Sequence, residues 1–225
     1  MRRLIILFFL FAPTALISQS SVSVGWLPEI SVSHKWNDQW RITGQVESMQ
    51  VGFTKRGSES FKTNYDYVRT DLTMVLSYRT NPSVSIAAGG MTRFVNGQLV
   101  YRSLQQISYA QRGRTVRFGH RFRTDQTFSN KRSMQLRLRY RFSGELPLQG
   151  QSLNEGEWYL ISSAEQIASV ERSKWEWEQR LSSAFGYYFN AKNKVEIGLD
   201  YRLDDFTQGD GRHRIWTMIN YFLNL

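Results

Sequence analysis

An all-β, membrane-spanning barrel is the fold that this sequence predicts, and the first observation is the segment Ser133–Phe142. Apolar residues there, such as Leu136 and Leu138, alternate with basic residues, such as Arg137 and Arg139. Successive side chains of a strand point to opposite faces, so this strand has one apolar face and one strongly basic face. Arginines are costly in the core of a soluble sandwich, whereas a membrane barrel has lipid outside and water or paired charge inside.

The second observation is that the same alternation recurs along the chain. Four more segments show it, at 68–79, 116–123, 175–189 and 195–203. The third observation is the composition: the mean hydropathy of the 225 residues is −0.45, yet 14% of them are aromatic. A membrane barrel explains both values, because only every second strand residue must be apolar and because Trp and Tyr gather at the two membrane interfaces.

The N-terminus has the pattern of a secretory signal peptide. It has a basic start at Arg2, an apolar run over Leu4–Phe11, and small residues at Ser18–Ser20. The apolar run is too short for a comfortable membrane-spanning helix. We therefore expect a signal peptide over residues 1–19 and a barrel over 20–225. The sequence contains no cysteine, so a lipoprotein anchor, disulfides and thiolate metal sites are excluded.

Six strands are predicted in the first half of the chain, because apolar and polar residues alternate there between turn signals. The second of these strands slips phase near Ser48–Met49, which predicts a β-bulge. The strands cover 27–36, 40–53, 65–79, 83–94, 98–110 and 114–124. The connections between them lie at Asn37–Asp38, 54–64, Asn81–Pro82, Asn96–Gly97 and Arg112–Gly113.

Five strands are predicted in the second half on the same grounds. Short and long connections broadly alternate, as in barrels with tight periplasmic turns, although 143–155 is long where a short turn is expected. Alternate residues from Ile215 to Leu225 are mostly apolar, which is typical of a last strand that pairs with the first. The strands cover 132–142, 156–167, 174–189, 193–204 and 213–225, and the connections lie at 124–131, 143–155, 168–173, Asn190–Asn193 and 204–212.

These segments number eleven, whereas single-chain bacterial barrels have even strand numbers. We therefore predict an antiparallel up-and-down transmembrane β-barrel of about 12 strands, with about 10 as the alternative. Val22, Val24 and Trp26 are the candidates for an additional first strand. We expect this barrel to be a monomer surrounded by outer-membrane lipid.

Charged side chains on the second face of these strands are the candidate functional residues. The basic set should face acidic residues of the following strands. Two interpretations stay open: a structural ladder of salt bridges, or a field across a narrow pore that favours small anions or zwitterions. The set comprises Arg117, Arg121, Arg123, Arg137, Arg139 and Arg141, followed by Glu165, Glu176, Glu178, Arg180, Glu196, Asp200 and Arg202.

Other functions find little support in the sequence. The net charge is +10, but the basic residues alternate along strands and no nucleic-acid-binding motif accompanies them. A serine hydrolase would need a serine beside a histidine; Ser129 and Ser133 are near His120 in sequence, without a GxSxG motif. Glu176 and Glu178 are expected to be charge partners rather than a catalytic pair. We expect no cofactor and no metal.

Short motifs follow one another along the chain: Tyr101-Arg102, Gln105-Gln106, 120–123, 137–140, 158–160 with Glu165, 179–181 and 196–201. Their order resembles the Bacteroidetes outer-membrane barrels of domain-of-unknown-function family 2490. The resemblance implies a small outer-membrane barrel of unassigned activity, and it supplies no catalytic or binding residues. The acidic residue that follows the His-Arg-x-Arg motif in the family is replaced by Thr124-Asp125, and Leu99 or Val100 stands where a Glu is usual. We expect these departures to weaken internal ion pairing.

The sequence therefore predicts a porin-like, non-enzymatic barrel in the outer membrane of a Gram-negative bacterium. It would act as a narrow channel with a charged lumen or as a structural component of the envelope. One alternative is a lipid-modifying enzyme of the deacylase or acyltransferase type. Another is a docking partner of an envelope complex, using external loops such as 54–64 or 204–212.

Overall fold

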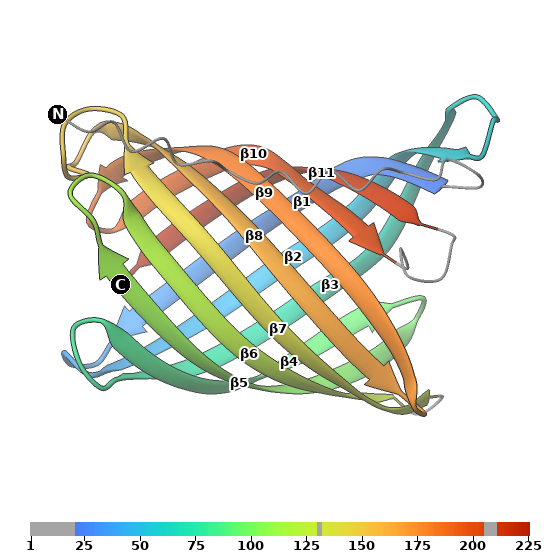
Figure 1. Cartoon of the computed structure of the whole chain (residues 1–225), viewed down its shortest axis with the longest axis horizontal. Coiled ribbons are helices and arrows are strands. Elements are labelled where there is room, and N and C mark those ends of the chain that lie inside the picture. The colour runs from blue at the N-terminus through green and yellow to red at the C-terminus, as the bar shows by residue number, and fades with distance from the viewer. Residues whose placement is uncertain (1–20, 130–131, 205–210) are drawn as a thin grey trace, which may run out of the picture.

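Eleven β-strands close into one barrel in the computed structural model, which describes residues 21–129, 132–204 and 211–225 (Figure 1). The predicted signal peptide lies outside the described residues. No helix in the described ranges has the length and apolar character needed to cross a membrane. The strands are β1 Ser21–Lys35, β2 Trp40–Arg56, β3 Lys62–Arg79, β4 Val84–Val95, β5 Gln98–Arg112, β6 Arg117–Ser129, β7 Arg132–Pro147, β8 Glu157–Glu171, β9 Lys174–Asn190, β10 Asn193–Asp204 and β11 Arg212–Asn224.

The predicted all-β barrel is confirmed, and the strand count is eleven rather than twelve or ten. The reason is that Val22, Val24 and Trp26 do not form a separate strand but continue β1 toward its N-terminal end. An odd number of consecutive strands brings the first and last together in the same direction. β1 therefore pairs in parallel with β11, from Ser21 opposite Arg212 to Ser33 opposite Asn224. The prediction of antiparallel pairing throughout is wrong at this one seam.

The strands extend further from the barrel centre than the sequence predicts. Both 124–131 and 168–173 were expected to be long connections, but β6 continues to Ser129 and β8 continues to Glu171. The backbone N–H and C=O groups of polar residues near the strand ends still form hydrogen bonds with the neighbouring strands. Polar side chains alone therefore do not end a strand. The turn Asn96–Gly97 is confirmed, with φ angles of 49° and 68° that suit a tight hairpin.

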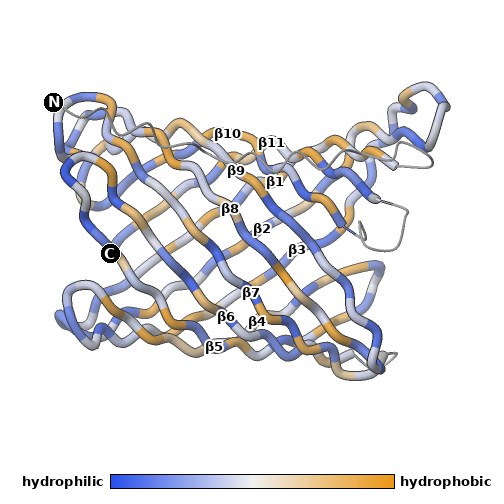
Figure 2. The backbone as a smooth tube through the Cα atoms, in the orientation of Figure 1, coloured by the Kyte–Doolittle hydropathy of each residue, from blue (hydrophilic) through white to orange (hydrophobic). Residues whose placement is uncertain are grey.

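The two faces of the barrel wall differ as predicted. Leu138 is 46% exposed and Met134 is 53% exposed on the outside, whereas Arg137 is only 8% exposed on the inside. Figure 2 shows the corresponding alternation of hydrophobic and hydrophilic residues along the strands. An apolar exterior around a charged interior is the arrangement expected of a barrel in a lipid bilayer.

The register between β2 and β3 shifts near the predicted position, but the extra residue belongs to β3: Met49 lies opposite Arg69 and Gln50 opposite Tyr67, which leaves Val68 unpaired. The prediction of a bulge in β2 at Ser48–Met49 is therefore wrong, because β2 has its extra residue at Gly52, where its pairing with β1 passes from Val51 to Phe53. Val68 was predicted to lie on the outer face of β3, but it packs against a buried apolar cluster that contains Leu27, Met49 and Trp216. An extra residue at a bulge shifts the alternation of faces, which explains the difference.

A hydrogen-bonded amide pair lies on the outer face of β5 and β6. Gln126 Nε2 donates to Gln105 Oε1 at 3.0 Å, and Gln105 Nε2 donates to Gln126 Oε1 at 3.2 Å. The hydroxyls of Thr124 and Ser103 also donate to these two oxygens, at 2.8 and 2.5 Å. Because lipid offers no hydrogen-bond partners, these four side chains form hydrogen bonds with one another.

Replacing one of these amides alone is expected to lower the free energy of unfolding more than replacing both. Gln126→Leu should lower the free energy of unfolding by about 1–3 kcal/mol, because Gln105 Nε2 and the Ser103 hydroxyl lose their acceptor in an apolar environment. The double variant Gln105→Leu/Gln126→Leu should return to the wild-type value or exceed it. Urea unfolding in lipid vesicles measures both, and additive losses would contradict the pairing.

Candidate lumenal site

The inward side chains of β6 to β9 converge on one carboxylate, Glu165 of β8, which is 3% exposed. Arg139 donates to it at 2.8 Å, Arg121 at 3.0 Å and Arg141 at 3.4 Å. Arg180 lies 3.9 Å away. The period of two along each strand places these residues on the same face, and the basic and acidic side chains meet at this carboxylate.

Asp125 of β6 is a second acidic centre, and it is fully buried. Arg123 Nε donates to Asp125 Oδ1 at 2.6 Å, and Arg139 Nη1 donates to Oδ2 at 3.4 Å. The sequence interpretation placed this residue in a connection and expected weaker pairing there. That expectation is wrong, because β6 continues past Thr124 and the alternation of Arg121, Arg123 and Asp125 points all three inward.

A third cluster surrounds Glu178 of β9. It accepts hydrogen bonds from Arg180 at 2.6 Å, from Arg137 at 3.5 Å and from Arg214 of β11 at 3.5 Å. Arg214 also forms an ion pair with Asp204 of β10, at 2.5 Å. The cluster therefore connects strands that are not neighbours, since β8, β9 and β10 lie between β7 and β11 in the barrel.

Glu196 of β10 is held by a phenol rather than by an arginine. Tyr159 Oη donates to it at 2.7 Å, and Lys194 lies 3.4 Å from it. The ring of Tyr159 lies over Gly186, where an added Cβ would come within 2.1 Å of a ring carbon, so only glycine leaves it room. Next along β10, Asp200 accepts a hydrogen bond from Arg202, and both are buried.

Two of the predicted residues lie at the mouths rather than in the network. We use "C-terminal mouth" for the end at which β11 ends and "N-terminal mouth" for the end at which β1 begins. The Arg117 side chain is 60% exposed at the C-terminal mouth, 3.5 Å from Glu145. Glu176 is exposed and lines a cavity at the N-terminal mouth with Gln135 and Asp204.

An ion-pair network that was not predicted from the sequence lies on β2, β3 and β4. Arg69 Nη2 donates to Glu47 at 3.1 Å, and Arg69 Nε donates to Asp71 at 3.2 Å. Arg93 donates twice to Asp71, at 2.7 Å in each bond. The alternation of 68–79 already placed Arg69 and Asp71 on the inner face, so their signal was present. Arg93 was harder to find, because the small residues of β4 give no clear apolar alternation.

Three cavities follow one another along the lumen in the described part of the chain, and a fourth, of about 210 Å³, lies beside the turn between β1 and β2. The first, at the C-terminal mouth, has a volume of about 440 Å³, the central cavity about 420 Å³, and the third, at the N-terminal mouth, about 230 Å³. Arg121 and Arg141 line both the first and the central cavity. Arg69, Arg93, Arg137 and Arg180 line both the central and the third cavity. Layers of arginine therefore separate the three spaces.

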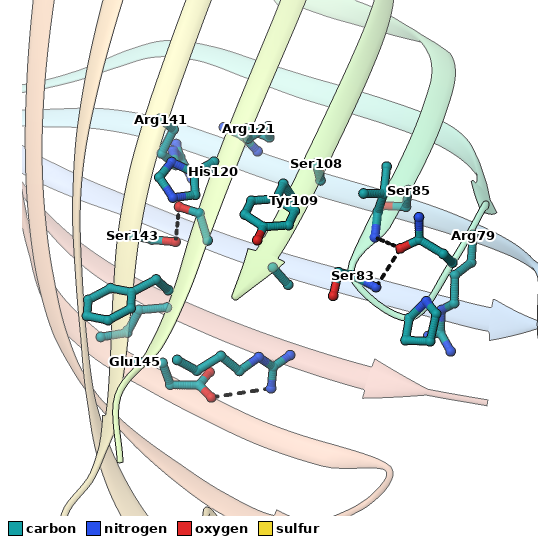
Figure 3. Close-up of a pocket in the computed structure, with 18 residues that line it drawn as sticks. Arg79, Ser83, Ser85, Ser108, Tyr109, His120, Arg121, Arg141, Ser143 and Glu145 are labelled. Carbon is teal, nitrogen blue, oxygen red and sulfur yellow. Dashed lines mark hydrogen bonds and ion pairs between the residues drawn. The ribbon is translucent and has the colours of Figure 1, made fainter. Parts of the chain in front are cut away.

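Basic side chains outnumber acidic ones in each cavity lining. The first has four arginines and one carboxylate, Glu145. The central lining has eleven basic and five acidic residues, and the third has six arginines and three carboxylates. Figure 3 shows the first cavity, with Arg121 and Arg141 beside each other and Ser85, Ser108 and Ser143 around the space.

The fold and the lumen together define a closed β-barrel with an apolar exterior and an interior of networked charge. The chain belongs to the family described as "Protein of unknown function (DUF2490)", whose model matches residues 25–213. The family resemblance inferred from the sequence is thus confirmed, while the Bacteroidetes origin stays a prediction. No curated protein matches the chain.

Among solved structures, the chain is similar to the crystal structure of the siderophore receptor PirA from Pseudomonas aeruginosa. The sequence identity is 19% and the TM-score is 0.34. The match covers 78% of this chain and 34% of the receptor, so the chain spans about a third of that protein.

Proposed function

We propose that the protein is a monomeric, narrow, anion-selective channel in the outer membrane of a Gram-negative bacterium. The observation that carries the proposal is the excess of arginine over carboxylate in three successive cavities of the lumen. Rings of arginine and lysine favour anions in pores. The apolar outer face of the barrel and the predicted signal peptide support the location in the outer membrane.

The arginine layers between the cavities would set the width of the channel. Arg121 is 25% exposed and Arg141 is 37% exposed at the first layer, so these side chains retain some contact with solvent. Long arginine side chains reorient within nanoseconds when they are not fully packed. Small anions would pass by exchanging between guanidinium groups, whereas larger solutes would be retained.

A structural component of the envelope is the second candidate function. The observation that favours it is the same set of layers, because side chains that fill a lumen can seal it. The lipid-modifying alternative has less support: Ser129 lies nine residues from His120 on β6, which is about 30 Å along a strand. His120 Nδ1 instead lies 2.9 Å from Tyr140 Oη on the outer face.

Conductance of the folded full chain in a planar bilayer tests the proposal. Under a salt gradient, the reversal potential should have the sign of anion selectivity. A barrel that inserts but shows no current steps would contradict the channel and support the structural role, and cation-selective steps would contradict the charge argument.

The variant Arg139→Gln should reduce the anion selectivity, because it removes a positive charge from the lining of the central cavity. The matched control is Lys62→Gln, which removes the same charge at the start of β3, where the side chain is 69% exposed. Selectivity measured from reversal potentials should change only in the first variant. Equal reversal potentials of the two variants would show that the lumenal charge does not set the anion selectivity.

A further inference from the structure

We infer that the layer between the first and the central cavity binds a phosphate-like oxyanion. The inference rests on the proposed channel and deepens it, because it names the class of solute. It concerns Arg121 and Arg141, which lie directly opposite each other on β6 and β7. Both side chains line the two cavities, so a solute that moves between them has to pass these guanidinium groups.

Positive charge exceeds negative charge around this layer. Arg121, Arg139 and Arg141 share the single carboxylate of Glu165, at 3.0, 2.8 and 3.4 Å. Arg139 has a second partner in Asp125, but Arg123 already pairs with that carboxylate at 2.6 Å. Glu29, which also lines the central cavity, interacts electrostatically with Arg141, so these four guanidinium groups face three carboxylates. Buried charges are stable when they are paired, and the layer retains an excess of positive charge.

Hydrogen-bond donors without a partner also lie on the arginines around this layer. The Nε atoms of Arg121, Arg139 and Arg141 are buried and have no hydrogen-bond partner among the described residues. The Arg139 side chain is only 8% exposed, so bulk water does not easily replace the missing acceptor. Buried donors are nearly always paired in folded proteins. Three unpaired donors on neighbouring arginines show that this layer has fewer acceptors than donors.

The chemistry of the donors selects the kind of anion. A guanidinium group presents a planar fork that matches two oxygens of a phosphate or a carboxylate. Two such forks, from Arg121 and Arg141, suit a tetrahedral oxyanion with two charges (Figure 3). Chloride has one charge and cannot bond to both nitrogens of a guanidinium fork through two oxygens, so it should bind more weakly. The first cavity, at about 440 Å³, has space for a small organic group attached to the phosphate.

Titration calorimetry of the folded full chain in neutral detergent micelles tests the inference. Inorganic phosphate should bind saturably, and chloride at the same ionic strength should bind at least about tenfold more weakly. Glycerol 3-phosphate is titrated in parallel, to distinguish free phosphate from a phosphate ester; saturable binding of either supports the site. Absence of saturable binding by both would overturn it.

Arg141→Gln should weaken phosphate binding by at least about tenfold, because it removes one charge-assisted fork. Arg141→Lys keeps the charge and should bind with intermediate affinity. The matched control is Arg214→Gln, which removes a lumenal arginine at the other mouth whose side chain is 25% exposed. Its affinity should equal that of the wild type. Equal weakening in Arg141→Gln and Arg214→Gln, or in neither, would overturn the site.

The inference and the proposed channel can fail separately. A barrel that carries no current but binds phosphate saturably would contradict the channel and retain the oxyanion site. A barrel with anion-selective steps and no saturable phosphate binding would retain the channel and contradict the site. Heat-modifiable migration on gels confirms that each variant is folded before it is titrated.

Discussion

Replacing Glu165 with Gln is expected to lower the free energy of unfolding of the barrel by roughly 3–5 kcal/mol. The carboxylate is 3% exposed and is the acceptor shared by Arg121, Arg139 and Arg141. The amide that replaces it has nearly the same shape but no charge. The arginines then repel one another in a lumen with little solvent to compensate for the loss. Urea unfolding in lipid vesicles, followed by tryptophan fluorescence, measures the change.

Glu176→Gln is the matched control for that substitution. Glu176 is also an inward carboxylate of the lumen, but it is exposed at the N-terminal mouth. Solvent screens an exposed charge, so the control should change the free energy of unfolding by less than about 1 kcal/mol. If Glu165→Gln were equally mild, the convergence of arginines on Glu165 would not be a stabilising feature of the fold.

Leu138→Arg is expected to cost roughly 2–4 kcal/mol of folding free energy in a bilayer. Leu138 is 46% exposed on the outer face of β7, midway along the strand. An arginine there would place a charge near the centre of the hydrocarbon, far from water at either interface. The same unfolding assay in vesicles gives the value.

Met134→Arg tests whether that cost depends on depth. Met134 is 53% exposed on the same face of the same strand, two residues from its N-terminal end. A long arginine side chain there reaches the interface, so the cost should fall to about 0–1 kcal/mol. Equal costs at the two positions, or no cost at Leu138, would contradict the membrane orientation of this face.

Local alternation carries most of the fold information in this sequence. Leu138 and Arg139 are neighbours with opposite chemistry, and that contrast alone fixes which face of β7 meets the lumen. The same rule correctly placed Glu165, Glu178 and Arg202 inside the barrel. It is reliable because the period of a strand is a local property and needs no knowledge of the partner strands.

Features that depend on distant pairing were not predictable in the same way. Whether Val22 and Trp26 start a new strand or continue an existing one is decided by the pairing of β1 with β2 and β11. Asp125 appeared to lie in a connection, because its sequence neighbourhood is polar. Its role as a partner of Arg139 depends on the register between β6 and β7. Neither the register nor the number of strands is encoded by any single segment.

The parallel seam between β1 and β11 also places the start of β1 and the end of β11 on opposite sides of a membrane. In a barrel with an even number of strands, the first strand begins on the side where the last one ends. Here Ser21 and Asn224 lie at opposite mouths, because β1 and β11 run in the same direction. A reagent confined to one compartment would therefore reach one of these strand ends and not the other.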